Sequence, residues 1–161
     1  MEQLFAPWRM SFIEKHDDSK GCVLCQILSE VDSAKEPQIL KVGKHAYVVM
    51  NKFPYSNGHL MVVPKRHEGD WLNLNSEELL ELNQLTQESI RVLKSVFQPQ
   101  GFNIGVNLGR AAGAGIEQHV HQHIVPRWVG DINFMPLLAE VKVISEHLQT
   151  TYHRIKQAWK N

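Results

Sequence analysis

The sequence predicts an α+β domain whose sheet is mainly antiparallel. Three observations predict this fold class: several strand-like segments come first, one long amphipathic helix follows them, and further strand-like segments come after it. The chain has 161 residues, of which 43% are hydrophobic and 21% charged. A chain of this length buries most of its apolar surface around one core, so we expect a single domain over residues 1–161.

Short helical and strand patterns alternate in the first half of the chain. Apolar residues at helical spacing predict a helix that begins at Val23. Two strand-like runs separated by a Gly-Lys pair predict a hairpin, and a segment rich in turn formers predicts a loop after it. The predicted elements are, in order, a helix from Val23 to about Lys35, strands over 39–42 and 45–50, a loop over 51–58 and a strand over 59–63 that Pro64 ends.

The longest predicted helix runs from Ser76 to Phe97. Asn75 is suited to its N-cap, and Glu78 stands where the glutamate of a capping box belongs. Leucine, isoleucine and phenylalanine residues give this helix one broad apolar face. The elements predicted after it are a strand over 102–108, a glycine-rich segment over 109–115, a strand over 119–125 closed by Pro126, a strand over 141–144 and a helix from about Ser145 to Trp159.

The charge and hydropathy of the chain argue against several classes of protein. The formal net charge is zero and the isoelectric point is about 7.1, so no overall field attracts nucleic acid or a membrane. No apolar run approaches the ~20 residues of a membrane helix, and the N-terminal residues lack the pattern of a signal peptide. We therefore expect a cytoplasmic protein with no nucleic-acid or membrane partner, and we expect no organic cofactor.

Three histidines, His119, His121 and His123, alternate with other residues within a stretch of five residues. On a strand all three project from one face, and the residues between them project from the other. On a regular strand His119 and His123 are about 13 Å apart, too far to share one metal ion. The geometry favours three separate roles over a single three-histidine metal cage, although a bend would bring the ends closer. One such histidine would most often be a core or surface residue, but three in strict alternation indicate function.

The glycine-rich segment from Gly109 to Gly115 precedes the histidines by three residues. Glycines let backbone amides approach a phosphate closely and form an anion-binding nest. Alone, the same pattern would be typical of a hairpin turn, but its position before the histidines favours phosphate binding. Arg110 is a candidate for a further phosphate contact, although a loop arginine is more often only solvated.

Two blocks of the sequence resemble the histidine triad family. The string His119-Val-His-Gln-His-Ile-Val125 is similar to the family signature His-φ-His-φ-His-φ-φ, where φ is apolar. Asn51, together with the string Asn57-Gly-His59-Leu-Met-Val-Val-Pro64, is similar to the family's second marker. The resemblance covers about residues 21–126. The start of the remaining tail, 127–161, resembles the subgroup that cleaves diadenosine tetraphosphate, particularly bacterial phosphorylases.

The resemblance implies a nucleotidyl transferase or hydrolase that acts on dinucleoside polyphosphates. In this family the middle histidine, here His121, attacks the α-phosphate and forms a covalent nucleotidyl-histidine, which water or orthophosphate then attacks. His123 is the expected hydrogen-bond donor to a phosphate oxygen. A neutral imidazole is a competent nucleophile near pH 7 because its unperturbed pKa is ~6.5. We also expect His59 to support the site from a buried position.

Five further residues are candidates for nucleotide binding. Asn51 resembles the family's ribose-binding residue, Asn107 precedes the phosphate loop, and Trp128 is a candidate for closing over the nucleotide. An asparagine at a strand end is commonly a turn former, and Trp128 could equally be a packed surface aromatic. The predicted nucleotide-binding residues are Asn51, Asn107, Gly113, Gly115 and Trp128.

The sequence departs from the family pattern at two places. Gln122 occupies a position that is usually apolar, and Gly113-Ala-Gly115 replaces the Gly-Gln-Ser or Gly-Gln-Thr of many members. The second change removes two contacts to the leaving group, which counts against a nucleoside phosphoramidate hydrolase. That hydrolase is the nearest alternative enzyme, and an adenine-nucleotide-binding regulator with little turnover is an alternative of another class. The intact His121 counts against the regulator.

The two cysteines of the chain, Cys22 and Cys25, lie in one Cys-x-x-Cys string. By itself this string fits a redox pair, half of a metal site or core packing. Some relatives in the family bind a structural zinc ion through such a pair, a histidine of a Pro-x-x-His string and the first triad histidine. The resemblance therefore implies zinc bound by Cys22, Cys25, His67 and His119, a normal tetrahedral set. It also implies a homodimer or a larger homo-oligomer.

Overall fold

The computed structural model describes residues 21–31, 38–131 and 144–160. Within these residues five antiparallel strands form one sheet in the order β1-β2-β3-β5-β4. The α+β prediction with a mainly antiparallel sheet is confirmed. The elements are α2 (Val23–Ser29), β1 (Ile39–Val42), β2 (Ala46–Met50), β3 (Leu60–Pro64), the 3₁₀ helix η2 (Trp71–Asn73), α3 (Ser76–Phe97), β4 (Gly101–Val106), the 3₁₀ helix η3 (Arg110–Ala112), β5 (Gln122–Arg127) and α5 (Leu148–Ala158).

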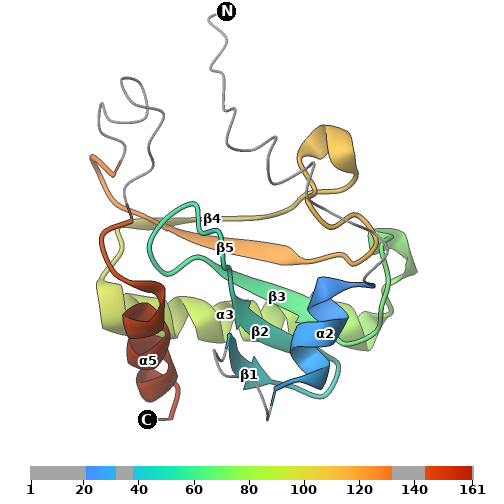
Figure 1. Ribbon diagram of the computed structural model, residues 1–161, viewed down its shortest axis with the longest axis horizontal. Coiled ribbons are helices and arrows are strands. Elements are labelled where there is room, and N and C mark those ends of the chain that lie inside the picture. Colours follow the sequence, from blue (N-terminus) through green and yellow to red (C-terminus); the bar gives the residue numbers. More distant parts are fainter. Residues whose placement is uncertain (1–20, 32–37, 132–143, 161) are drawn as a thin grey trace, which may run out of the picture.

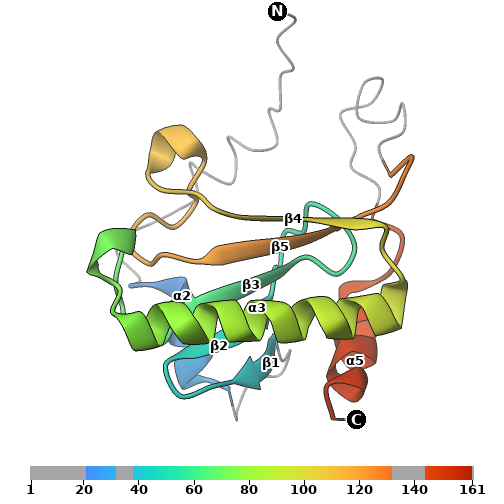
Figure 2. The ribbon, with the colours of Figure 1, turned by 180° about the vertical axis from the view of Figure 1, so that it is seen from behind.

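Helices lie on both faces of the sheet. The long α3 crosses one face, and the short α2 lies on the other (Figures 1 and 2). Alternate residues of β2 show the consequence: Val48 packs into the core under α3, whereas Tyr47 and Val49 pack with Leu24 of α2. Because both faces are covered, every residue of β2 is buried.

The long helix α3 has the predicted bounds and the predicted N-terminal cap. The side chain of Asn75 accepts from the N–H of Glu78, and the Glu78 carboxylate accepts from the N–H of Asn75. Such a cap contributes about 1 kcal/mol to helix stability because it satisfies amide groups that the helix itself leaves unpaired. Glu78 also binds Arg66 at 2.9 Å, which ties the start of α3 to the loop after β3.

The two other helices differ from their predicted bounds. Helix α2 ends at Ser29, with Glu30 as its C-cap, rather than near Lys35, and the side chain of Val31 beyond it is 38% exposed. The C-terminal helix is confirmed as α5, and it begins at Leu148 rather than Ser145. The predicted strand over 141–144 falls almost wholly outside the described residues, and Ile144 lies in no strand.

The strand that carries the histidines begins later than predicted. Strand β5 starts at Gln122, so His119 and His121 precede it. The reason is that β4 ends at Val106, which pairs with Gln122. The segment before Gln122 therefore has no residue of β4 to pair with. Strand β5 instead continues through Pro126 to Arg127, where it pairs with β4 but no longer with β3. A proline is tolerated there because the strand has a neighbour on one side only.

Strand β4 shows the same kind of shift. It runs from Gly101 to Val106 rather than over 102–108, and it forms one edge of the sheet. Among the described residues, no helix has the length and apolar character needed to cross a membrane.

Candidate active site

The structure places the three histidines on the sheet face opposite α3. The residues between them contact the α3 side: Val120 and Ile124 belong to the core under α3, and Gln122 Nε2 donates to Thr86 Oγ1 of that helix at 2.8 Å. The predicted alternation therefore holds even though the segment before Gln122 is not a regular strand. The rings of His121 and His123 meet edge to face with centroids 4.9 Å apart.

The His121 side chain is buried, with 6% exposed, and has one nitrogen committed to the backbone. Its Nδ1 lies 2.8 Å from the carbonyl oxygen of His119. A carbonyl oxygen only accepts, so Nδ1 carries the proton and Nε2 of the neutral ring carries the lone pair. Burial lowers the pKa of His121 below its ordinary value, and the hydrogen bond to the carbonyl opposes this only in part. The side chain is thus favoured in its neutral form, with Nε2 as the nucleophilic atom.

A chain of hydrogen bonds fixes the proton of His123 in the same way. The backbone N–H of Tyr55 donates to His59 Nδ1 at 3.0 Å, so the proton of a neutral His59 is on Nε2. His59 Nε2 lies 3.0 Å from His123 Nδ1 and donates to it. In the neutral His123 ring the remaining proton is then on Nε2, where it can be donated to a ligand oxygen. The expected buried support by His59, which is fully buried, takes the form of this relay.

Sequence reasoning missed Tyr55, the residue at the start of the relay. Its ring also lies against the two histidines, with centroids 4.6 Å from His59 and 5.8 Å from His123. A backbone N–H contact leaves no mark on residue type, so only the position of Tyr55 in the turn before His59 could have indicated it.

The two asparagines predicted to bind nucleotide lie close to the histidines. Asn51 Nδ2 is 3.3 Å from His59 Nδ1, and Asn51 Oδ1 accepts from the N–H of Phe53 at 2.9 Å. Asn107 directly follows Val106, whose partner across the sheet is the residue after His121. Both asparagines therefore border the site, and their contacts with ribose and phosphate stay predictions.

The glycine-rich loop folds into a tight turn beside the site. Gly109 and Gly113 have φ angles of 75° and 88°, a region that only glycine enters without strain. The N–H of Gly113 donates to the carbonyl of Arg110 at 2.9 Å, and its carbonyl accepts from Asn107 Nδ2 at 3.4 Å. A phosphate contact from this amide would require that turn bond to open. Arg110 is paired with Glu117 at 2.8 Å, so its charge is partly neutralised, and Gly115 lies half-buried in the same loop.

The structure does not bring Trp128 next to the histidines of its own chain. Trp128 follows the end of β5 and lies five residues beyond His123. In an extended strand this corresponds to about 16 Å between the two Cα atoms. Its backbone N–H donates to Asp131 at 3.3 Å, which holds the turn after β5. Closure of Trp128 over a nucleotide stays a prediction without support from this geometry.

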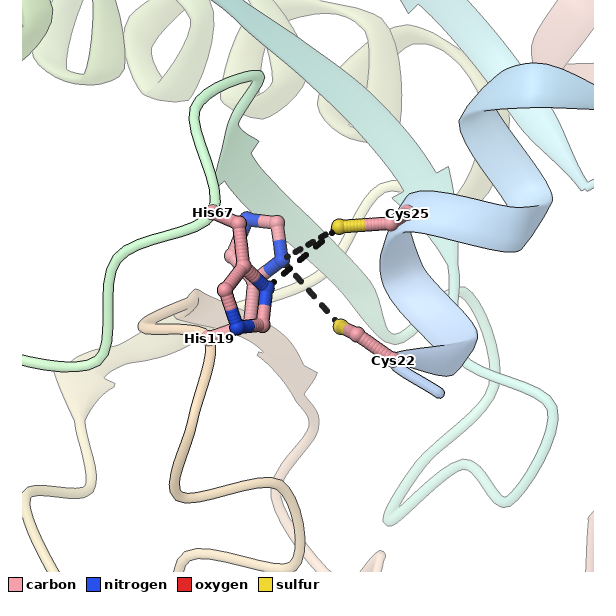
Figure 3. A group of neighbouring side chains, drawn as sticks. All are labelled: Cys22, Cys25, His67 and His119. Carbon is pink, nitrogen blue, oxygen red and sulfur yellow. Dashed lines mark hydrogen bonds between the residues drawn. The ribbon is translucent and has the colours of Figure 1, made fainter. Parts of the chain in front are cut away.

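Four potential metal ligands meet at the N-terminal end of α2. The ligand atoms of Cys22, Cys25, His67 and His119 all lie within 4.8 Å of one another. Figure 3 shows them facing a common centre, with Cys22 at the N-cap of α2, Cys25 in its first turn, His67 on the loop after β3 and His119 on the segment before β5. His119 Nδ1 is 3.3 Å from Cys22 Sγ and 3.4 Å from Cys25 Sγ, and His67 Nδ1 is 3.4 Å from Cys25 Sγ.

This donor set fits a zinc ion. Bonds of ~2.3 Å to sulfur and ~2.0 Å to nitrogen place tetrahedral sulfur and nitrogen ligands about 3.5 Å apart, close to the spacing of these side chains. The second nitrogen of His119 supports the same conclusion, because Nε2 donates to the carbonyl of Pro64 at 2.8 Å and leaves the Nδ1 lone pair for a metal. Among the described residues, the ligand atoms that converge are those of Cys22, Cys25, His67 and His119, and neither His121 nor His123 belongs to this group, so the three-histidine cage is not formed.

The fold and this site define the class of protein. A family model described as the HIT domain, where HIT stands for histidine triad, matches residues 34–129. The chain therefore belongs to the HIT family.

Particular relatives extend this finding over almost the whole chain. An AP-4-A phosphorylase from Mycobacterium tuberculosis is 38% identical over 165 residues, which cover 99% of this chain and 85% of the relative. A zinc-bound histidine triad family protein from Mycobacterium smegmatis has a similar structure, with a TM-score of 0.70, 24% identity, and coverage of 88% of this chain and 95% of that one. A diadenosine triphosphate hydrolase from Plasmodium falciparum, solved with cyclomarin A, has a TM-score of 0.61 at 18% identity and covers 84% and 93%. At these identities the two structures establish a shared fold.

Proposed function

We propose that this protein is an enzyme that cleaves dinucleoside polyphosphates of the diadenosine tetraphosphate type at an α-phosphate, through a nucleotidyl group bound to His121. The observation that carries the proposal is the fixed tautomer of His121, whose Nδ1 donates to the His119 carbonyl and whose Nε2 keeps the lone pair. The similarity to a relative named AP-4-A phosphorylase over 99% of the chain supports this substrate class.

The reaction proceeds in two displacements at phosphorus. His121 Nε2 attacks the α-phosphorus, the bond to the bridging oxygen breaks, and a nucleoside triphosphate leaves with that oxygen. His123 Nε2–H donates to a non-bridging oxygen, where charge accumulates in the transition state. Water or orthophosphate then attacks the phosphorus of the intermediate, the P–N bond breaks, and His121 regains its lone pair. When water is the acceptor, the second product is a nucleoside monophosphate. When orthophosphate is the acceptor, the second product is a nucleoside diphosphate.

The remaining predicted contacts surround this centre. We assign the ribose to Asn51 and the phosphate chain to Asn107 and the loop with Gly113 and Gly115, since all of them border the histidines or the turn next to them. Orthophosphate is the acceptor we favour, because the similar relative carries the name of a phosphorylase.

We also propose that Cys22, Cys25, His67 and His119 hold a structural zinc ion. The support is the convergence of four ligand atoms within 4.8 Å and the free Nδ1 lone pair of His119. A bound ion would tie α2 to the loop after β3 and to the segment before β5, and thus add to folding stability. Elemental analysis of protein purified without chelator or affinity-tag metal is expected to find about one zinc per chain, and Cys22→Ser is expected to lower both the zinc content and the melting temperature. If the protein contains no zinc and Cys22→Ser leaves the melting temperature unchanged, the proposed zinc site is absent.

The assembly and location of the protein are further proposals. We favour a homodimer because β4 is an edge strand of the sheet and its Ile104 side chain is 48% exposed. Sedimentation analysis that gives only monomer at micromolar concentration would contradict this. Cys22 and Cys25 form no disulfide bond, which favours a reducing compartment such as the cytoplasm.

Incubation with diadenosine tetraphosphate, with and without orthophosphate, tests the main proposal. ADP plus ATP indicates phosphorolysis and AMP plus ATP indicates hydrolysis, and either result supports the proposed function. If the protein forms no product from diadenosine tetraphosphate, the proposed function is wrong. In that case cleavage of adenosine phosphoramidate identifies the alternative hydrolase, and tight binding of AMP without any turnover identifies a regulator.

A further inference from the structure

We propose that the cluster of Cys22, Cys25, His67 and His119 positions the nucleophile His121, in addition to any role in stability. The link is the backbone carbonyl of His119, so His119 is a positioning residue that acts through His121. This inference depends on the proposed function, in which His121 Nε2 attacks phosphorus.

One residue belongs to both sites. The carbonyl of His119 accepts the Nδ1 proton of His121 at 2.8 Å, and the imidazole of the same residue is a member of the cluster. Free histidine prefers the proton on Nε2, so the carbonyl is what favours the opposite tautomer in His121. A displaced carbonyl would therefore allow the proton to move to the atom that must attack.

The position of this carbonyl is not fixed by the sheet. Regular pairing of β5 begins only at Gln122, three residues after His119. The preceding segment is held by separate anchors: the N–H of Val120 donates to the carbonyl of Glu68 at 2.7 Å, and His119 Nε2 donates to the carbonyl of Pro64 at 2.8 Å. The cluster around His119 Nδ1 is the third anchor.

The third anchor joins the segment to the same part of the chain as the first two, which runs from Pro64 at the end of β3 to Glu68 in the loop after it. His67 lies in the loop after β3, between Pro64 and Glu68 (Figure 3). This loop touches the segment closely: a Cβ at Gly69 would lie 2.7 Å from the carbonyl oxygen of Glu117. Metal coordination of both His67 and His119 would lock this contact and fix both nitrogens of the His119 ring. Fixing the ring limits the rotation of the residue, and with it the direction of its carbonyl.

His67 offers the cleanest experimental separation of the two roles. Its side chain is exposed and lies in the cluster rather than beside His121 or His123, so its replacement leaves the reacting side chains intact. His67→Ala removes one ligand, whereas His67→Cys changes the set to three cysteines and one histidine, which is also a normal zinc site. His153→Ala on α5, another exposed histidine, is the matched control.

Three quantities are measured on each purified full-length variant: zinc content, the ¹⁵N shifts of the His121 ring, and the rate of nucleotidyl transfer to the protein in a single turnover. We expect His67→Ala to lose zinc, to shift the proton of His121 towards Nε2 and to slow the transfer by at least about 10-fold, because a small misplacement of a reacting group is costly. His67→Cys restores all three, and His153→Ala changes none.

The outcomes separate this inference from the proposed function. If His67→Ala loses zinc and melts at a lower temperature while the His121 spectrum and the transfer rate stay unchanged, the cluster is only structural and the inference is wrong. Failure of a zinc-loaded His67→Cys to restore the spectrum also overturns it, as does wild-type protein without metal. If wild-type protein never becomes nucleotidylated although the His121 spectrum follows the zinc content, the positioning link stands and the proposed function fails.

Discussion

The two faces of the sheet are built in different ways. The face under α3 is a continuous apolar core, in which side chains such as Leu60, Leu82 and Ile124 are buried to 1% exposure or less. On the opposite face, the described residues form an apolar cluster where α2 covers the sheet, and next to that cluster lie the buried histidines His119, His121 and His123. Each of these histidines has a defined hydrogen-bond partner.

This difference separates stability from chemistry. The stabilising free energy of apolar packing is proportional to the buried area, and the packing tolerates small changes of shape. An apolar core can therefore support a fold without fixing the positions of individual atoms. Hydrogen bonds to a backbone carbonyl or a buried ring fix one proton on one atom, which the proposed mechanism requires. We therefore expect substitutions on the histidine face to change mainly the rate and substitutions on the α3 face to change mainly the stability.

The largest expected effect is the loss of turnover in His121→Ala. Removal of the nucleophile eliminates the covalent route, and the rate of diadenosine tetraphosphate cleavage should fall by at least about 10³-fold. Adenine nucleotide binding should survive, since the pocket is otherwise unchanged, and the variant should remain folded at the assay temperature. Kinetic assays and calorimetric titration with AMP measure these quantities. A variant that keeps more than a small fraction of the wild-type rate removes His121 from the nucleophile role.

The next effect is a slower reaction in His123→Ala. This change removes one donor to the phosphate rather than the nucleophile, so we expect a decrease in kcat of ~10²–10³-fold, by comparison with deletion of an oxyanion-hole donor. His153→Ala serves as a control for loss of a histidine elsewhere. An unchanged kcat would mean that the proton fixed by the Tyr55 and His59 relay is not used in the reaction.

On the α3 face, Leu82→Ala tests the other half of the comparison. Leu82 is 1% exposed in the core under α3, so its truncation should lower the free energy of unfolding by about 2–5 kcal/mol. Urea denaturation measures the loss. The kcat of the folded fraction should be unchanged at a temperature well below the transition. A large decrease in kcat at full folding would show that the two faces are not independent.

Sequence patterns predicted the α3 face better than the histidine face. The bounds of α3 follow from its capping residues and its apolar period, which are local properties of Asn75, Glu78 and the helix itself. The start of β5 depends on where β4 ends, which is a property of a distant segment. The strand predicted to begin at His119 therefore begins at Gln122.

The candidate site was predictable in its residue types but not in its contacts. The spacing of the histidines and the family resemblance identified His121, His123 and the four potential zinc ligands, which the structure brings together in two neighbouring groups. The relay from Tyr55 uses a backbone N–H, and the Gly113 amide is engaged by a backbone carbonyl. Such contacts depend on chain conformation rather than residue type, so a sequence pattern does not reveal them.

The smallest effect concerns Gln122, a polar residue that joins the histidine segment to the α3 face. Its Nε2 donates to Thr86 Oγ1 at 2.8 Å, and the Thr86 hydroxyl donates in turn to the carbonyl of Leu82 at 2.7 Å. In Thr86→Val the buried amide of Gln122 loses this acceptor, which should cost about 1–3 kcal/mol of unfolding free energy. In Gln122→Leu the Thr86 hydroxyl keeps its carbonyl partner, so the cost should be about 1 kcal/mol or less.

The double variant decides whether this pair is a structural contact or part of the catalytic arrangement. With both polar groups replaced by apolar ones, Gln122→Leu with Thr86→Val should be more stable than the sum of the single changes predicts, by about 1 kcal/mol in a double-mutant cycle. All three variants should keep the wild-type kcat, because the Gln122 side chain points away from His121 and His123. A coupling energy near zero would show that Gln122 and Thr86 do not stabilise each other. A decrease in kcat without loss of stability would place Gln122 among the residues that position the histidines.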